Sequence, residues 1–161
     1  MSELRIIAIT SELADQVRAT MVSPGYGHPV TAKIATGLGP CRHCLQPFAM
    51  DGEVRLLFTL NPFDGVAPIP QPGPVFLHQA ACKRHEERDE YPEGLLQLGA
   101  LLDGYDAEQM IRRRELVAKD VSPEMTMREM LMDPLVRYVV VRDPNAGCYR
   151  MRVERREGND G

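Results

Sequence analysis

The segment 135–154 constrains the fold more than any other part of the chain. It reads LVRYVVVRDPNAGCYRMRVE, with two runs rich in β-branched and aromatic residues on either side of the turn-forming cluster DPNAG, which predicts a β-hairpin. If Arg142 pairs with Cys148, alternate residues form two different faces, because successive side chains of a strand point to opposite sides. One face would carry Val139, Val141, Tyr149, Met151 and Val153, and the other Tyr138, Arg142, Cys148, Arg150 and Arg152.

Shorter strand and helix patterns alternate along the rest of the chain. The run VRLLFTL reads as a largely buried strand, and SPEMTMREMLMDP has the Ser, Pro and closing Pro of a capped helix. We expect strands at 5–9, 54–60 and 75–78, helices following Thr10 or Ser11 and Ser122, and one or two helical turns from Gln79. Residues 23–40 have Gly and Pro at both ends and little periodicity, which predicts a long surface loop.

Residues 106–118 allow two interpretations. Asp106 with Gln109 three places later resembles a capping box, and Met110, Ile111 and Val117 fit a helical stripe. The competing interpretation is a hairpin that turns at 106–109. The local pattern slightly favours the helix.

Length and composition favour one domain. A chain of 161 residues with 43% hydrophobic residues can bury a single core. Thirteen prolines and the absence of Trp argue against a helical bundle. We predict a single α+β domain over 1–156, with a mostly antiparallel or mixed sheet, a C-terminal β-hairpin and a few packed helices, followed by a disordered tail at 157–161.

Charge and hydropathy exclude several classes of protein. The formal net charge of -4 argues against a nucleic-acid binder, which would need a basic surface to neutralise phosphates. No apolar run is long enough to cross a membrane, and the first residues lack the pattern of a signal peptide. We therefore expect a cytoplasmic protein, in which four reduced cysteines are ligands, reactive thiols or small buried residues.

The cysteines and histidines suggest a metal site. Cys41 and Cys44 form a CxxC turn after Gly-Pro, and such a turn lets two thiolates reach one tetrahedral zinc ion. A second pair, His78 and Cys82 in HQAAC, completes a Cys3His set if a helix starts at Gln79 and turns both side chains to one side. Substitute ligands are His43, His85 and Cys148.

Other chemistry is open to the same residues. Cys41 and Cys44 have the spacing of a redox pair, although no helix follows that would lower a thiol pKa. Cys82 has His78 and His85 within one helical turn, which is an arrangement for a nucleophilic cysteine. The simplest alternative is that Cys82 is a small core residue.

The arginine-bearing face of the hairpin is a candidate anion site. Arg142, Arg150 and Arg152 would gather beside Cys148, where guanidinium groups can hold a carboxylate or phosphate. An exposed strand face is equally often basic for solubility alone. The chain lacks a phosphate-binding Gly-rich loop, a GxSxG elbow and an HExxH motif, so the common nucleotide, hydrolase and metalloprotease signatures are absent.

Several motifs together resemble a known family. GPCRHCL, NPF, GPVFLHQAAC, YPEGL and the hairpin sequence occur in this order, and the chain is similar over 1–156 to the bacterial family called domain of unknown function 1203. The resemblance implies a small α+β domain without an established activity, and a strand, turn and strand around YDAEQM. It implies a site shared by the motif residues Cys41, His43, Cys44, His78, Cys82, Gly147, Cys148 and Tyr149.

Three functional hypotheses follow. The first is a protein with a structural zinc centre of Cys41, Cys44, His78 and Cys82, beside a candidate small-ligand site of Cys148, His43, Arg142, Arg150, Arg152 and Tyr149. The second is an enzyme that uses Cys82 or Cys148 as thiolate, His78 or His43 as base and the arginine face for a small anionic substrate. The third is an interaction module without chemistry. The sequence indicates no reaction and no oligomeric state, and neither nucleic acid nor membrane is expected as a partner.

Overall fold

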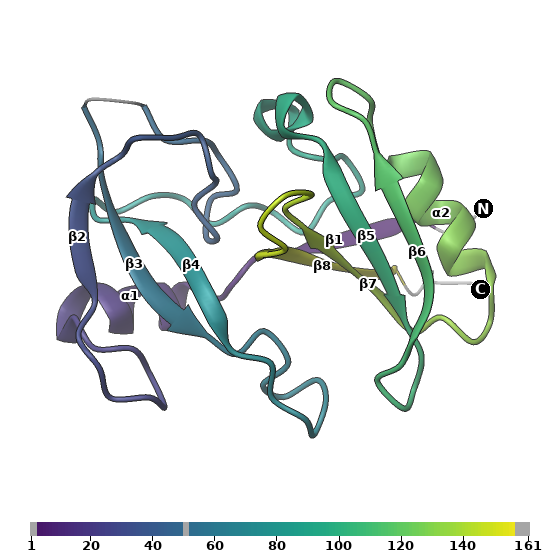
Figure 1. Ribbon diagram of the computed structural model, residues 1–161, viewed down its shortest axis with the longest axis horizontal. Coiled ribbons are helices and arrows are strands. Elements are labelled where there is room, and N and C mark those ends of the chain that lie inside the picture. Colours follow the sequence, from purple (N-terminus) through teal and green to yellow (C-terminus); the bar gives the residue numbers. More distant parts are fainter. Residues whose placement is uncertain (1–2, 50–51, 157–161) are drawn as a thin grey trace. The chain divides into compact units, whose positions relative to one another are not determined.

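Two antiparallel sheets contain the named strands of residues 3–49 and 52–156, the part of the chain that the computed structural model describes (Figure 1). They belong to two compact units, one of Met1–Ile7 with Glu86–Gly161 and one of Ala8–His85. The α+β class and the C-terminal hairpin are confirmed. The single domain over 1–156 stays a prediction, and the expected tail at 157–161 lies outside the described residues. Within the described ranges, no helix is long and apolar enough to span a membrane.

The first unit contains a five-stranded sheet in the order β1-β8-β7-β5-β6. Every neighbouring pair in it is antiparallel. Its elements in chain order are β1 (Leu4–Ile7), the short 3-10 helix η1 (Glu93–Leu98), β5 (Ala100–Tyr105), β6 (Ile111–Val117), α2 (Glu124–Met132), β7 (Tyr138–Arg142) and β8 (Tyr149–Arg155).

The hairpin of β7 and β8 has a different register from the expected one. Val139 pairs with Val153 and Val141 with Met151, and a bulge then brings Arg142 opposite Tyr149 rather than Cys148. The pairing moves by two residues, so these four apolar residues still share one face. In the turn that follows, the Asp143 carboxylate accepts hydrogen bonds from the backbone N–H groups of residues 145 and 146.

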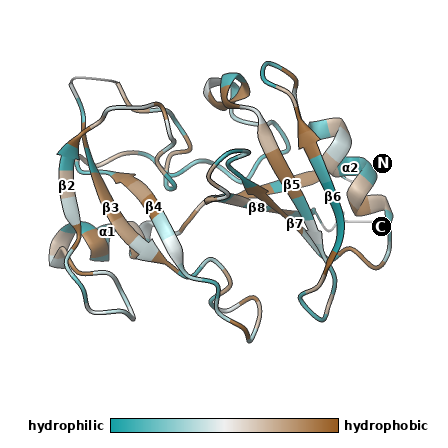
Figure 2. Ribbon diagram, viewed as in Figure 1, coloured by the Kyte–Doolittle hydropathy of each residue, from teal (hydrophilic) through white to brown (hydrophobic). Residues whose placement is uncertain are grey.

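Helix α2 covers the apolar face of this sheet through a close approach at Gly104. A Cβ atom at Gly104 would lie 3.2 Å from Met130 Cε and 3.2 Å from Val136 Cγ1. Met127, Met130 and Leu131 of the helix are buried, whereas Met125 and Met132 are exposed. Figure 2 shows the contrast between brown β5 and largely teal β6 at the sheet edge.

Residues 100–117 form a hairpin, which decides between the two interpretations of this segment. The Asp106 side chain accepts hydrogen bonds from the backbone N–H groups of Glu108 and Met110, and Gln109 has a left-handed φ of 63°. The local helix pattern was therefore misleading. The same Asp that resembles a helix cap here closes a turn, because a short carboxylate can satisfy backbone donors in either structure.

The second unit contains a three-stranded antiparallel sheet in the order β2-β3-β4 and one helix. Leu56 and Phe58 of β3 pair with Leu77 and Val75 of β4, and all four side chains are buried. Thr10 caps the helix by accepting a hydrogen bond from Leu13 N–H, as expected. The elements are α1 (Ser11–Thr20), β2 (Thr31–Ile34), β3 (Val54–Leu60) and β4 (Gly73–His78).

Two predictions for this unit are wrong. Residues 23–40 are not all loop, since β2 lies within them; all four of its residues are exposed, so it lacks the apolar alternation that would reveal a strand. No helix begins at Gln79. Arg84 instead donates hydrogen bonds to the carbonyls of Ala8 and Ile9, and these long-range contacts override the helix propensity of the segment.

Candidate metal centre

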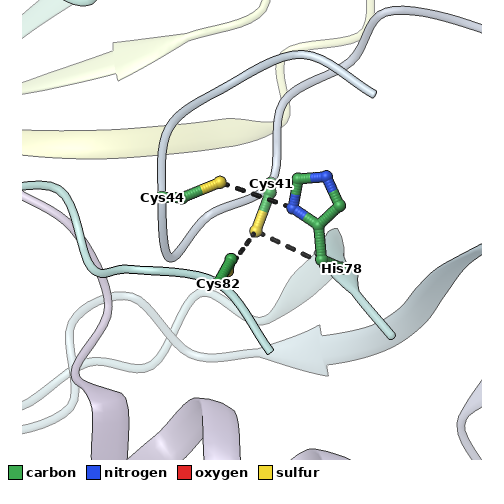
Figure 3. Close-up of side chains that lie close together, drawn as sticks. All are labelled: Cys41, Cys44, His78 and Cys82. Carbon is green, nitrogen blue, oxygen red and sulfur yellow. Dashed lines mark hydrogen bonds between the residues drawn. The ribbon is translucent and has the colours of Figure 1, made fainter. Parts of the chain in front are cut away.

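Four potential ligands meet at one point of the second unit. Figure 3 shows Cys41, Cys44 and Cys82 gathered on one side of the His78 ring. One atom from each, three Sγ atoms and a ring nitrogen, lies within 4.8 Å of all the others. These are the four residues that the sequence predicted as a Cys3His set.

The CxxC turn at residues 41–45, which we call the knuckle, is held against β4. This contact explains why Cys41 and Cys44 meet His78 and Cys82. Leu45 N–H donates to the Cys41 carbonyl at 2.9 Å, and Leu45 has a left-handed φ of 55°, so the chain turns sharply. Cys41 forms a parallel bridge with Phe76, and Arg42 N–H donates to the Phe76 carbonyl at 3.0 Å. His78 follows Phe76 by two residues and therefore lies beside the knuckle.

Cys82 reaches the cluster on an irregular loop. Gln79 N–H donates to the Val54 carbonyl at 3.2 Å, which extends the contact with β3 by one residue. His85 N–H donates to the His43 carbonyl at 2.9 Å and closes the loop on the knuckle. One backbone hydrogen bond on each side of Cys82 thus positions this residue in the cluster. The helix that the sequence predicted for this purpose does not form.

The distances between ligand atoms match a tetrahedral zinc ion. Zn–S bonds of about 2.3 Å require sulfur atoms about 3.8 Å apart, and a Zn–N bond of about 2.05 Å requires sulfur and nitrogen about 3.6 Å apart. Cys41 Sγ lies 3.8 Å from Cys82 Sγ, and Cys44 Sγ lies 3.4 Å from His78 Nδ1. The remaining pairs are at most 4.8 Å apart, so closing on an ion needs movements of about 1 Å.

Glu53 orients the histidine. Its Oε2 lies 2.8 Å from His78 Nε2 and also accepts a hydrogen bond from Ala49 N–H at 3.0 Å. A histidine that ligates a metal usually donates its other ring N–H to a carboxylate, which fixes the tautomer. With Nε2 on Glu53, His78 Nδ1 is the nitrogen that remains for a metal.

Proximity shifts the pKa values of the cluster in opposite directions. A hydrogen bond from Cys44 lowers the pKa of the Cys41 thiol, and the same contact raises the pKa of Cys44. Burial, followed by the charge on Cys41, raises the pKa of Cys82, and hydrogen bonding to Cys41 raises the pKa of His78. Several negative charges this close repel one another, so a bound cation would favour the deprotonated form of the thiols.

Arg18 and His43 both contact the Cys82 sulfur. Arg18 NH2 lies 3.2 Å and His43 Nδ1 3.1 Å from Cys82 Sγ. Burial lowers the pKa of His43 and favours its neutral form. The sequence pattern had marked His43 as a substitute ligand and a candidate site residue, but gave no signal for Arg18 or Glu53, which are separated from their partners by 64 and 25 positions.

A protein-family model that covers most of the chain identifies its family. The profile described as "Protein of unknown function (DUF1203)" matches residues 39–155. The chain belongs to this family. The DUF1203 match includes all four residues of the cluster and ends at the last residue of β8. No curated protein and no solved structure matches the chain.

The other candidate site residues of this DUF1203 chain lie in its first unit. Cys148 and Tyr149 follow the turn of the last hairpin, and each of the three arginines already faces a carboxylate. Arg142 Nε lies 3.0 Å from Asp103 Oδ2, Arg150 NH2 2.9 Å from Asp143 Oδ1, and Arg152 Nε 3.5 Å from Glu154 Oε2. Asp103 is fully buried and also binds Arg114 through both oxygens. Each arginine thus has an ionic partner, while Arg150 Nε and Arg152 Nε are buried without a hydrogen-bond partner among the described residues. The anion site stays a prediction.

Proposed function

We propose that Cys41, Cys44, His78 and Cys82 bind one zinc ion and that this ion is structural. The observation that carries the proposal is the spacing of the ligand atoms, 3.8 Å between two sulfurs and 3.4 Å between sulfur and nitrogen. Three thiolates and one imidazole form a donor set that suits Zn²⁺ and its tetrahedral preference.

The number of ligands supports a structural role over a catalytic one. Catalytic zinc sites use three protein ligands and keep the fourth position for water or substrate, whereas structural sites are closed by four. Here four side chains surround the point, and Cys41 and His78 are buried, at 0% and 9% exposure. The ion would join the knuckle, the end of β4 and the loop 79–85, which are linked otherwise by a few backbone hydrogen bonds.

A cytoplasmic location belongs to the same proposal. Zinc binds thiolates and not disulfides, and thiols stay reduced in the cytosol. The four cysteines are free.

Metal analysis combined with thiol titration tests the proposal. Purified protein should contain about one zinc per chain. In that form only Cys148, which lies outside the cluster, should react quickly with a thiol reagent, and a chelator should expose the other three cysteines. The Cys148→Ser variant is the matched control and should show no fast thiol until the metal is removed. Metal-free protein with a fast cysteine in the cluster would contradict the proposal.

A second candidate function is a cysteine-dependent enzyme, and one observation favours it. Ser11 Oγ, the His43 ring and Cys82 Sγ form a chain of contacts of 2.9 and 3.1 Å, which is the order of an orienting group, a base and a nucleophile. The same experiment separates the two functions. An enzyme of this kind should be metal-free, with a fast Cys82 that His43→Ala slows.

A further inference from the structure

The Cys82 sulfur has contacts that differ from those of the other ligand atoms. We infer that Arg18 and His43 are positioning residues of the metal site, whose hydrogen bonds hold the Cys82 thiolate in place and offset the negative charge of the centre. The inference rests on the proposed zinc site and adds to it two residues outside the ligand set.

Arg18 joins two of the proposed ligands. Its NH2 group lies 3.2 Å from Cys82 Sγ, and its Nε–H donates to the His78 carbonyl at 3.0 Å. The side chain is 13% exposed, so these hydrogen bonds have little competition from water. A rigid guanidinium with donors on adjacent nitrogens can make both contacts at once, which the single ammonium group of a lysine does less well.

His43 reaches the same sulfur from the knuckle. Its Nδ1 lies 3.1 Å from Cys82 Sγ and its Nε2 lies 2.9 Å from Ser11 Oγ, and the residue is 2% exposed. A consistent proton arrangement has the Ser11 hydroxyl donating to Nε2 and Nδ1–H donating to the sulfur. In this arrangement the Cys82 sulfur is the acceptor, as it would be in the thiolate form that a metal binds.

Charge explains why the site needs a cation beside the metal. Three thiolates and one Zn²⁺ carry a net charge of about -1, because zinc binds thiolates in their deprotonated form. Arg18 adds the positive charge that neutralises this centre. Its other ionic contact is weaker, since Asp15 lies 3.5 Å away and its side chain is 75% exposed.

The contacts also distinguish the partly buried Cys82 from the buried Cys41. Cys41 Sγ accepts a hydrogen bond from the backbone N–H of His78 at 3.4 Å. Cys82 Sγ accepts a hydrogen bond from the charged Arg18 at 3.2 Å and contacts His43 Nδ1 at 3.1 Å, both shorter distances. Hydrogen bonds to a charged sulfur stabilise it and make its lone pairs less available.

Both donors connect the centre to α1. Arg18 lies in the last turn of this helix, and Ser11, the partner of His43, is its first residue. The centre would therefore fasten both ends of α1 to the sheet of its own unit, in addition to joining the three ligand-bearing segments.

Zinc competition with a chromophoric chelator measures the effect of these contacts. The zinc dissociation constant of Arg18→Met should rise about 10–100-fold, which is the usual effect of removing a residue that contacts a metal ligand. Arg18→Lys keeps the positive charge and should lose less zinc affinity than Arg18→Met. His43→Asn retains a side-chain hydrogen-bond donor near the position of Nδ1 and should bind zinc more tightly than His43→Ala.

A matched arginine provides the control. Arg55 lies in the same unit, donates to Thr36 Oγ1 at 3.2 Å and stacks on Phe76, and neither of these two contacts involves a proposed ligand. Arg55→Met should keep the wild-type zinc affinity. Cobalt-loaded protein adds a readout that general destabilisation does not move, because loss of hydrogen bonds to one thiolate shifts the sulfur-to-cobalt absorption band to longer wavelength.

The outcomes separate this inference from the proposed function. Wild-type protein that binds no zinc contradicts both. Wild-type protein that binds zinc, with Arg18→Met and His43→Ala unchanged in zinc affinity and cobalt spectrum, contradicts the inference alone. If Arg18→Met does not fold, Arg18→Lys and the two His43 variants decide by the same two measurements.

Discussion

Replacing one proposed ligand should remove the stabilisation of the second unit by zinc. The stability of the metal-free protein should stay almost unchanged. Cys44→Ala is the best substitution, because Cys44 is only partly buried and the exchange removes a single sulfur atom. Without zinc we expect a loss of about 1 kcal/mol or less in the free energy of unfolding. With zinc the variant lacks one of four ligands and should bind the ion far more weakly.

The size of the effect follows from the linkage between binding and stability. Zinc stabilises the state that binds it by RT ln(1 + [Zn]/Kd), which is about 2.7 kcal/mol at a free zinc concentration of 100 Kd. The opening of the ligand-bearing segments should therefore become about 100-fold rarer in the wild-type protein. The Cys44→Ala variant should show almost none of this change at the same zinc concentration.

Hydrogen exchange read by mass spectrometry measures this opening segment by segment. The informative amides are those of Arg42, Leu45 and His85, which donate to the carbonyls of Phe76, Cys41 and His43 at 3.0, 2.9 and 2.9 Å. They lie between or beside the ligands and are protected only while the cluster is closed. The amides of β7, in the first unit, serve as internal control and should exchange at the same rate with and without zinc.

One result would refute the reasoning. If zinc-buffered and chelator-treated wild-type protein exchange these three amides at equal rates, the cluster does not use zinc to hold its segments. Equal zinc-dependent slowing in Cys44→Ala would refute it as well, since Cys44 would then not be a ligand.

Three other perturbations test separate parts of the structure. Glu53→Gln keeps a hydrogen bond to His78 but loses its charge, so the zinc dissociation constant should rise about 10-fold; an unchanged value by chelator competition would mean that Glu53 does not orient the ring. Zinc affinity should rise steeply with pH, by about two to three powers of ten per pH unit near neutrality. The reason is that zinc must displace protons from two thiols and an imidazole, Cys44, Cys82 and His78, whose pKa values are raised. Zinc affinity that does not change with pH in competition assays would contradict this prediction. Gly104→Ala should destabilise the first unit by about 1–3 kcal/mol in urea unfolding, since the new Cβ would lie 3.2 Å from Met130 and Val136; an unchanged midpoint would show that α2 can move away.

The sequence predicted which four residues meet in the cluster better than it predicted the structure that brings them together. CxxC spacing and HQAAC identified the four residues, because zinc chemistry limits which side chains can serve. The reason given for Cys82, a helix from Gln79, was wrong. Hydrogen bonds to Val54 and His43 position the loop instead, and such contacts between distant segments leave no trace in a local pattern.

The fold shows the same division between local and distant causes. The C-terminal hairpin and β3 were predictable because alternating or continuous apolar residues determine which face is buried. Strand β2 was not, since its four residues are exposed and its pairing comes entirely from β3. Asp106 was ambiguous because its carboxylate can cap a helix or close a turn, and only the pairing of β5 with β6 and β7 selects the turn.

Arg18 and Glu53 could not be found from the sequence. Arg18 reads as an ordinary charged residue near the end of a surface helix, and Glu53 as one before a strand. Each acquires its role from a residue far along the chain, Cys82 in one case and His78 in the other. His43 was found only because it lies inside the CxxC motif.

The order of the ligands along the chain has a consequence for synthesis. Cys44 and Cys82 are 38 residues apart (82 − 44 = 38), and β3 and β4 lie between them. At a translation rate of about 5–20 residues per second, the knuckle waits about 2–8 seconds for its partners. If the proposed zinc site forms, Cys41 and Cys44 are a bare dithiol on the growing chain during that time, and a reducing environment would have to protect them until His78 and Cys82 arrive and the ion can bind.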